Sequence, residues 1–274
     1  MWCWGTTSGS LGDGTTRSSA TPVAVSGLTD ARSIAVGTSH ACALDGSQAV
    51  WCWGANGAGQ VGDGTTTTRT EPVEVTGIDG PVTTIAAGAT FTCAVTQAGG
   101  AWCWGNVPGS AASTATPTQV AGLSRVARIA GGTTSACAVV DSGQVLCWGN
   151  GDGGQLGNGS RAASATPVAV SGIADAIEVD MGQVHACAVL DGGGVSCWGQ
   201  GTHGELGDGT AKASTVPVDV ASIDGATSVS AGGDQTCATT KAGATCWGDD
   251  TDGEVGVPPP SYVPSDVDGG QSFA

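Results

Sequence analysis

Cysteine is the residue type in this sequence with the clearest capacity for covalent chemistry. The chain has 11 cysteines, and ten of them form pairs spaced ten residues apart, or nine in the last pair. The stretch ACALDGSQAVWCWG (41–54) predicts a hairpin whose cysteines face each other across two antiparallel strands, at a distance suited to a disulfide. The predicted disulfides are Cys42–Cys52, Cys93–Cys103, Cys137–Cys147, Cys187–Cys197 and Cys237–Cys246, with Cys3 unpaired.

Two other uses of these thiols remain open: reduced structural cysteines and a zinc site. Zinc is disfavoured because the sequence has no CxxC pairs, and five identical two-cysteine half-sites are poorly suited to tetrahedral coordination. Disulfides require an oxidising compartment, so we expect an extracellular or cell-surface location.

The histidines offer little for catalysis. His40 and His185 occupy one repeat position, two residues before a cysteine, which we interpret as a packing position. The same position holds Phe91, Ser135, Gln235 and Phe273 in other repeats. His203, with Glu205 near it in a glycine-rich loop, is interpreted as a solvated loop histidine. The sequence has no GxSxG or HExxH motif, so we predict a protein that is not an enzyme, with no catalytic residues, metal or cofactor.

Two glycine motifs, GAGQVG (57–62) and GQGTHG (199–204), match the dinucleotide-binding pattern but lead into turns rather than a helix. The sequence DDTDGE (249–254) lacks the spacing of a calcium-binding EF-hand loop. The Gly-flanked residues Asp13, Asp63, Asp208 and Asn158 are expected to form Asx-turns.

Charge excludes further classes of partner. The chain carries 24 Asp and Glu against 8 Lys and Arg, a formal net charge of −16. Binding of polyanions requires basic clusters, so we expect no nucleic-acid or anionic-membrane partner. No run of 18 apolar residues is present, and no membrane span is predicted.

The elements that carry these residues are repeated. The cysteine of the motif CWG recurs at 3, 52, 103, 147, 197 and 246. Each repeat contains four short β-tolerant segments, exemplified by SIAVG, HACAL, AVWCWG and TPVAV, the last with a proline that an edge strand tolerates. Four strands in each repeat of this length predict an all-β fold, a β-propeller with one blade per repeat.

We expect six blades of four antiparallel strands in a single domain, 1–274. The predicted blades are 31–78, 82–123, 126–173, 176–223, 226–263, and 265–274 with 1–28, so that pairing of the N- and C-terminal strands closes the ring. Tryptophans of the CWG motif should fill the space between blades, since each buries roughly 150–250 Å²; a solvent-facing aromatic platform is the alternative. These are Trp4, Trp53, Trp104, Trp148, Trp198 and Trp247.

The motifs GTSHACAL, VWCWGANGAGQVGDGTTT, PVEVTGI and CWGNGDGGQLGNGS resemble the regulator of chromosome condensation repeat family, in the cysteine-bearing version of secreted bacterial proteins. The resemblance implies a β-propeller, typically of seven blades, with a broad loop-bearing face that binds another protein. The family includes an exchange factor for a small GTPase, ubiquitin-ligase accessory domains and a bacterial β-lactamase inhibitor.

The expected function is therefore non-catalytic binding of a protein partner. The turns after the first strand of each blade differ between repeats, and we expect them to form the binding face. Its predicted members are Phe91, Gln183, Asp234 and Gln271. A carbohydrate- or small-ligand-binding propeller and an inhibitor of a bacterial enzyme are the alternatives.

Overall fold

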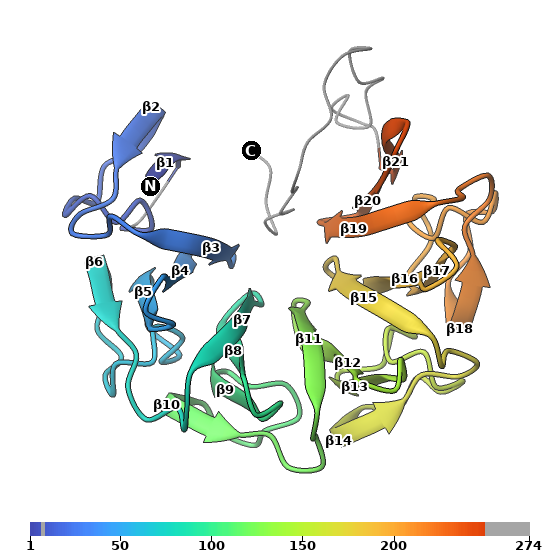
Figure 1. The fold of residues 1–274 in the computed structure, drawn as a ribbon, viewed down its shortest axis with the longest axis horizontal. Helices are drawn as coiled ribbons and strands as arrows, with labels where there is room; N and C mark the ends of the chain where they lie inside the picture. Colours follow the sequence, from blue (N-terminus) through green and yellow to red (C-terminus); the bar gives the residue numbers. More distant parts are fainter. Residues whose placement is uncertain (7–8, 250–274) are drawn as a thin grey trace. The chain divides into compact units, whose positions relative to one another are not determined.

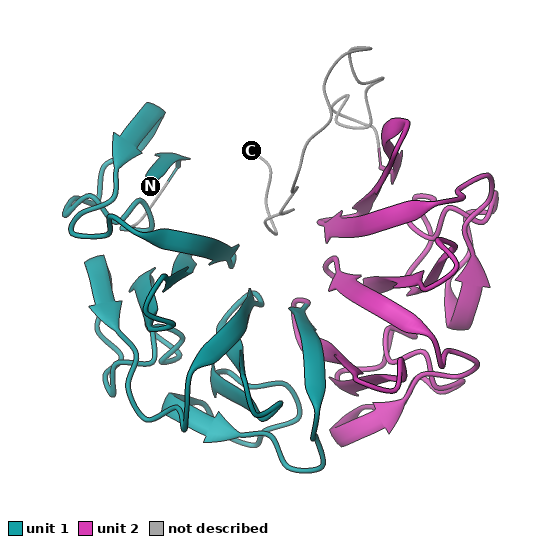
Figure 2. Ribbon diagram, in the orientation of Figure 1, with its two compact units in different colours: residues 1–131, 274 teal, residues 132–273 magenta. Residues whose placement is uncertain are grey.

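The computed structural model describes residues 1–6 and 9–249 as β-strands joined by turns and loops (Figure 1). The chain divides into two compact units, unit 1 up to Gly131 and unit 2 from Gly132 (Figure 2). Over the described ranges, no helix has the length and apolar character needed to cross a membrane.

Unit 1 contains a two-stranded sheet, two four-stranded antiparallel sheets and one further strand. The two-stranded sheet pairs β1 (Trp2–Gly5) with β2 (Ser19–Ala24). The first four-stranded sheet has the order β3 (Ala31–Val36), β4 (His40–Asp45), β5 (Val50–Gly54), β6 (Arg69–Glu74). The second has β7 (Val82–Ala87), β8 (Phe91–Thr96), β9 (Ala101–Gly105), β10 (Thr114–Gln119). The last strand, β11 (Val126–Gly131), packs against β7 and β8.

Unit 2 continues the same pattern. Its first strands are β12 (Ser135–Val140), β13 (Val145–Gly149) and β14 (Ser164–Ala169). A complete four-stranded sheet follows, made of β15 (Ala176–Met181), β16 (His185–Leu190), β17 (Val195–Gly199) and β18 (Ser214–Asp219). The last sheet has three strands, β19 (Ala226–Gly232), β20 (Gln235–Thr240) and β21 (Gly243–Gly248).

The described strands make five blades, so the prediction of six is wrong. The blades are β3–β6, β7–β10, β11–β14, β15–β18 and β19–β21. The described residues of the range 1–28 contain two strands, the WCWG strand β1 and the Pro-x-x-Val strand β2, and two strands cannot make a four-stranded blade. Residues 265–274, which we expected to complete that blade and close the ring, lie outside the described residues.

Within a blade, the register follows from alternation of side chains along each strand. Cys42 on β4 lies directly opposite Cys52 on β5. The proline-bearing strand β6 is the edge strand, where a missing N–H costs no ladder hydrogen bond. The glycine that ends the WCWG motif is required by both conformation and space: Gly54 has φ 104°, and a Cβ there would lie 2.6 Å from the Cα of His40.

Every blade has one disulfide between its second and third strands. The bonds are Cys42–Cys52, Cys93–Cys103, Cys137–Cys147, Cys187–Cys197 and Cys237–Cys246, with Cα atoms 4.0 to 4.1 Å apart. Cys3 is free and half-buried, and burial raises the pKa of its thiol. Both cysteines are buried in the first four of these blades, whereas Cys237 and Cys246 are half-buried in the last.

Four of the CWG tryptophans are core residues: Trp53, Trp104, Trp148 and Trp198 are at most 1% exposed. Trp53 packs with Val25 and Leu28, which precede β3, and thus lies between the N-terminal segment and its own blade. Trp247 is half-buried. Trp4 departs from the expected pattern, because it is 63% exposed on the two-stranded sheet of β1 and β2.

Candidate binding face and histidine–carboxylate cluster

In unit 2, the turns between the first and second strands of neighbouring blades are linked by backbone hydrogen bonds. The N–H of Thr133 donates to the carbonyl of Gln183 (3.2 Å), and the N–H of Gln183 donates to the carbonyl of Gly233 (3.0 Å). We use the term loop face for these turns (132–134, 182–184 and 233–234) together with the long loops 150–161 and 200–212. The loop face brings residues from three repeats into one continuous surface.

The four residues predicted to form the binding face differ in their location and exposure. Gln183 is exposed on the loop face, and Asp234 lies on it half-buried. Phe91, by contrast, is completely buried at the start of β8, so its assignment to a binding surface is wrong. The reason is register: Phe91 occupies the strand position of the buried His40, one residue beyond the turn. Gln271 lies outside the described residues.

A cavity of about 600 Å³ opens on the loop face of unit 2. The polar side chains of its lining are contributed by residues such as Thr133, Thr134, Asn150, Asp152, Arg161 and Gln200. Arg161 is held in place by donating from Nη1 to the carbonyl of Asp152 (2.6 Å), and the N–H of Asp152 donates to Oδ1 of Asn150 (2.7 Å). Sequence reasoning pointed to the turn at Thr133 and Thr134, because the turns after the first strand differ between repeats, but it gave no sign that this turn borders a depression.

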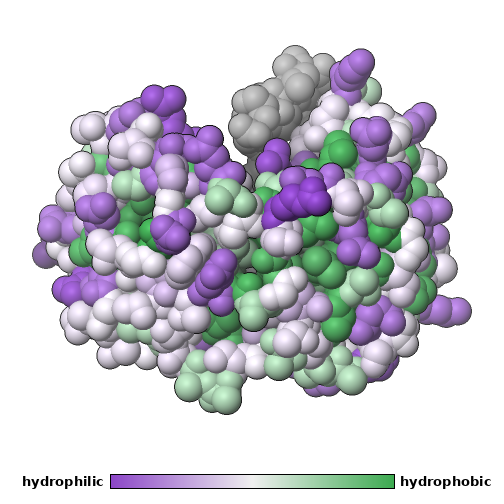
Figure 3. Space-filling model, turned by 60° about the horizontal axis from the view of Figure 1, so that its bottom comes forward, coloured by the Kyte–Doolittle hydropathy of each residue, from purple (hydrophilic) through white to green (hydrophobic). Residues whose placement is uncertain are grey.

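The face of the molecule drawn in Figure 3 mixes hydrophilic, near-neutral and apolar residues. None of the cavity-lining residues is aromatic. A carbohydrate site normally uses an exposed aromatic platform, whereas this lining provides hydrogen-bonding groups but no aromatic surface for stacking on a sugar.

His203, Glu205 and Asp234 form a compact cluster at one end of the loop face. Nδ1 of His203 lies 3.3 Å from Oε1 of Glu205 and 3.9 Å from Oδ2 of Asp234. The side chain of Glu205 is completely buried, whereas that of Asp234 is 32% exposed and that of His203 is 47% exposed. The sequence pointed to His203 and Glu205 as neighbours, but Asp234 comes from the next blade and only the fold brings it to them.

The charges of the cluster shift the pKa values of two members. The hydrogen bond to Glu205 and the negative charge of that residue raise the pKa of His203. Partial burial, followed by repulsion from Glu205, raises the pKa of Asp234. Asp249 adds further negative charge that acts on both groups in the same direction. The site is therefore a locally anionic position with one basic side chain.

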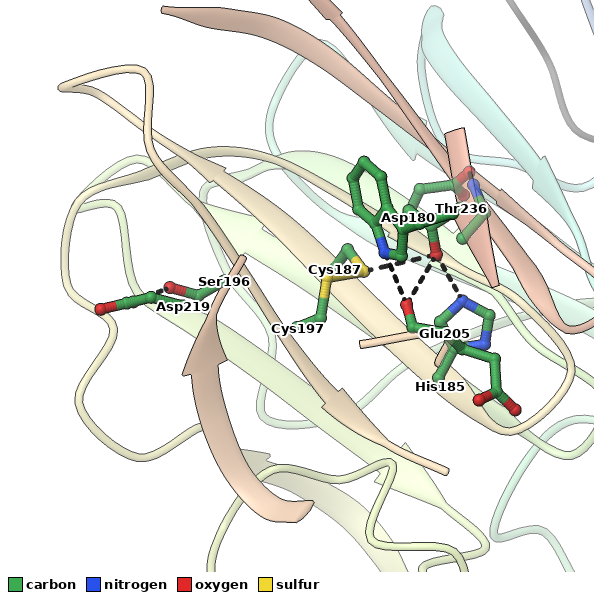
Figure 4. The surroundings of a disulfide bond; sticks show 10 residues. Asp180, His185, Cys187, Ser196, Cys197, Glu205, Asp219 and Thr236 are labelled. Carbon is green, nitrogen blue, oxygen red and sulfur yellow. Dashed lines mark hydrogen bonds between the residues drawn. A yellow bond between two sulfur atoms is a disulfide. The ribbon is translucent and has the colours of Figure 1, made fainter. Parts of the chain in front are cut away.

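Below the loop face, buried histidines connect neighbouring blades. In Figure 4, Nε2 of His185 lies 2.8 Å from Oγ1 of Thr236, which also donates to the carbonyl of Glu205 (3.2 Å) and lies 3.7 Å from Sγ of Cys187. His40 and Thr92 repeat this arrangement in unit 1. Burial lowers the pKa of each histidine to about 4, so both are neutral at pH 7. Their packing role agrees with the interpretation of this repeat position.

The glycine-flanked acidic residues form the expected turns. The backbone N–H groups of Thr15, Thr65 and Thr210 donate to Asp13, Asp63 and Asp208 at 2.8 to 3.0 Å. Asn158 accepts the N–H of Ser160 in the same way, at 3.0 Å. Asn158 and Asp208 thus stabilise the two long loops of the loop face, and Asp13 and Asp63 stabilise equivalent loops in unit 1.

Comparison with known families gives an identity to this architecture. The family model described as Regulator of chromosome condensation (RCC1) repeat matches residues 1–44, 47–95, 142–189 and 192–239, more than half of the chain. The chain belongs to the regulator of chromosome condensation repeat family. A second model of this RCC1 repeat matches residues 31–60, and no curated protein sequence matches the chain.

Several solved structures share the fold of this chain. Prp20p of Saccharomyces cerevisiae, described with its binding properties to Gsp1p and histones, is 25% identical with a TM-score of 0.83. The alignment covers 98% of this chain and 71% of Prp20p. Yeast RCC1 (Prp20) in a complex with Kap60 gives 24% identity and a TM-score of 0.83, covering 95% of this chain and 67% of that one. Human WBSCR16 is 21% identical with a TM-score of 0.81, and the alignment covers 96% of this chain and 74% of WBSCR16.

Proposed function

We propose that this RCC1-repeat chain is a non-catalytic protein-binding module and that the loop face of unit 2 carries the binding surface. The observation that carries the proposal is that three repeats with nearly identical strands present three different turns on this face, linked through the backbone into one surface. An asymmetric surface on a repeated scaffold is what recognition of an asymmetric partner requires. Proteins bound by RCC1-type relatives, namely Kap60, Gsp1p and histones, support binding of a protein in general and not of those partners.

The chemistry of the face also favours a protein partner. Arg161 stands at the cavity, and arginine is enriched among the residues that dominate binding energy at protein interfaces. The hydroxyl and amide groups around it can supply direct hydrogen bonds of the kind that protein–protein interfaces contain.

We further propose that the module works outside the cell or at the cell surface. Five intrablade disulfides support this location, because reducing compartments keep such thiols unpaired. We also propose a bacterial origin, which is supported by the resemblance of the cysteine-bearing motifs to those of secreted bacterial repeat proteins.

Site-specific photo-crosslinking tests the proposed face. A benzophenone amino acid at Gln183 should capture a discrete protein from the secreted fraction of the source organism. The same group at Thr166, which is exposed on the edge strand β14, should not. Arg161→Ala and Gln183→Lys should then weaken binding of the purified partner at least tenfold with unchanged melting temperature. Equal capture from both positions, or binding unaffected by both substitutions, would contradict the proposal, and saturable binding on a glycan array would favour the carbohydrate alternative.

A further inference from the structure

We propose that His203, Glu205 and Asp234 form a binding site for a divalent cation of the zinc class. The three residues offer one imidazole nitrogen and two carboxylates, and their ligand atoms all lie within 4.8 Å of one another. In a tetrahedral zinc site with bonds of about 2.0–2.2 Å, ligand atoms lie roughly 3.3–3.6 Å apart. The separations of 3.3 Å and 3.9 Å from Nδ1 of His203 therefore need only small side-chain adjustments to enclose an ion.

The burial of Glu205 and the negative charge of the cluster favour binding of a cation. Its carboxylate is completely buried, and burial of a charge is costly unless an opposite charge compensates it. Within the described part of the chain, the ion pairs of Glu205 and Asp234 are both with His203, which carries at most one positive charge. One imidazolium between two carboxylates leaves net negative charge, and a divalent ion bound to the three would neutralise it.

The internal repeats show that loop architecture does not require this carboxylate. Oε2 of Glu205 accepts the backbone N–H of His203 at 2.7 Å. Gln60 and Gln155, at the equivalent position, make the same bond through an amide oxygen, each at 2.9 Å, to the residue two positions earlier. A neutral glutamine therefore satisfies the loop, and the acid at 205 needs another explanation.

The other two members of the cluster are replaced in the same repeats. Fifty residues earlier, the trio His203, Glu205 and Asp234 corresponds to Gly153, Gln155 and Val184. Those positions are also neighbours, since a Cβ on Gly153 would lie 2.3 Å from Cγ1 of Val184 and 3.0 Å from Oε1 of Gln155. In unit 1 the corresponding residues are Ala58, Gln60 and Thr90. Three neighbouring positions thus hold residues without charge in two repeats, and in a third repeat all three hold potential metal ligands.

The ligand set selects the class of ion. Imidazole with carboxylates suits zinc and its transition-metal neighbours, whereas magnesium and calcium prefer oxygen ligands throughout. Three protein ligands leave a fourth position for water or for a group from another molecule. Because His203 is half-exposed on the loop face, that fourth position faces outward. The proposal stands apart from the proposed protein binding, since a metal site there is testable without any partner.

Calorimetric titration of the oxidised full chain with zinc chloride tests the site. A Cys3→Ser background removes the free thiol as a competing ligand. We expect one zinc per chain, with no saturable binding of magnesium chloride. Glu205→Gln and Asp234→Val, which install the residues of the preceding repeat, should each weaken zinc binding at least about tenfold.

Asp208→Asn is the matched control. Asp208 lies in the same loop and acts in an Asx-turn that Asn158 makes in the preceding repeat, so this variant should bind zinc as the parent does. Near-ultraviolet circular dichroism and melting without zinc should be unchanged in Glu205→Gln, because the amide keeps the bond to the N–H of His203. The proposal fails if the parent shows no saturable zinc binding, or if zinc binds equally well to Glu205→Gln and Asp234→Val.

Discussion

The indole N–H of Trp104 donates a hydrogen bond to the backbone carbonyl of Gln60, 2.9 Å away and 44 residues earlier in the chain. The same carbonyl accepts a bond of 2.8 Å from Oγ1 of Thr92, which in turn lies 2.9 Å from Nε2 of His40. The tryptophan of one blade is thus fixed to the loop of the preceding one. Trp198 and Trp247 make the equivalent bonds in unit 2, to the carbonyls of Gln155 and Glu205.

This contact predicts that tryptophans of the same motif contribute very differently to the free energy of unfolding. Trp104→Ala should lower the free energy of unfolding by about 3–5 kcal/mol, because it removes a completely buried ring and leaves a cavity. Trp4→Ala, at a 63% exposed position, should change it by no more than about 0.5 kcal/mol. Urea denaturation of both variants measures the difference, and similar losses at the two positions would show that burial does not distinguish them.

Buried His40 predicts an acid-sensitive stability. Burial lowers its pKa from 6.5 to about 4, so between these values the unfolded chain binds a proton that the folded chain does not. Stability should therefore fall as the pH drops from about 6.5 to 4, by at most about 3 kcal/mol for this residue. His40→Phe, which installs the residue found at the equivalent position 91, should flatten the dependence in chemical denaturation measured across that range. The pKa of His185 is lowered in the same way, so part of the pH dependence should remain in His40→Phe. If the substitution left the pH dependence of stability wholly unchanged, His40 would not be its cause.

The disulfides predict a local contribution to stability. Replacing Cys42 and Cys52 together by alanine should lower the free energy of unfolding by about 3 kcal/mol, because the bond closes a loop with a sequence separation of 10. Cys3→Ser should have little effect, since Cys3 is free. Alkylation of the denatured, unreduced chain followed by peptide mass spectrometry should find a single modified cysteine, Cys3. Alkylation at Cys42 or Cys52 would contradict the pairing.

The sequence by itself determined most of the architecture of each blade. The ten-residue cysteine spacing predicts a hairpin, because side chains alternate along a strand and only one register places two cysteines opposite each other. The glycine-flanked acids predict Asx-turns, because an oxygen acceptor and an N–H two residues on are all that such a turn requires. These are local relations, so a single stretch of chain contains all the information they need.

Only the tertiary structure decided which residues of different repeats meet. Phe91 was expected on a surface and is buried, because its exposure depends on the blade packed beside it. Asp234 lies beside His203 and Glu205 across 31 positions in the sequence, through the stacking of one blade on the next. The number of blades likewise depends on which strands find partners, and among the described residues β1 and β2 pair with each other and with no third strand. Contacts between repeats depend on how the blades pack against each other, and a local sequence pattern that recurs in every repeat does not specify that packing.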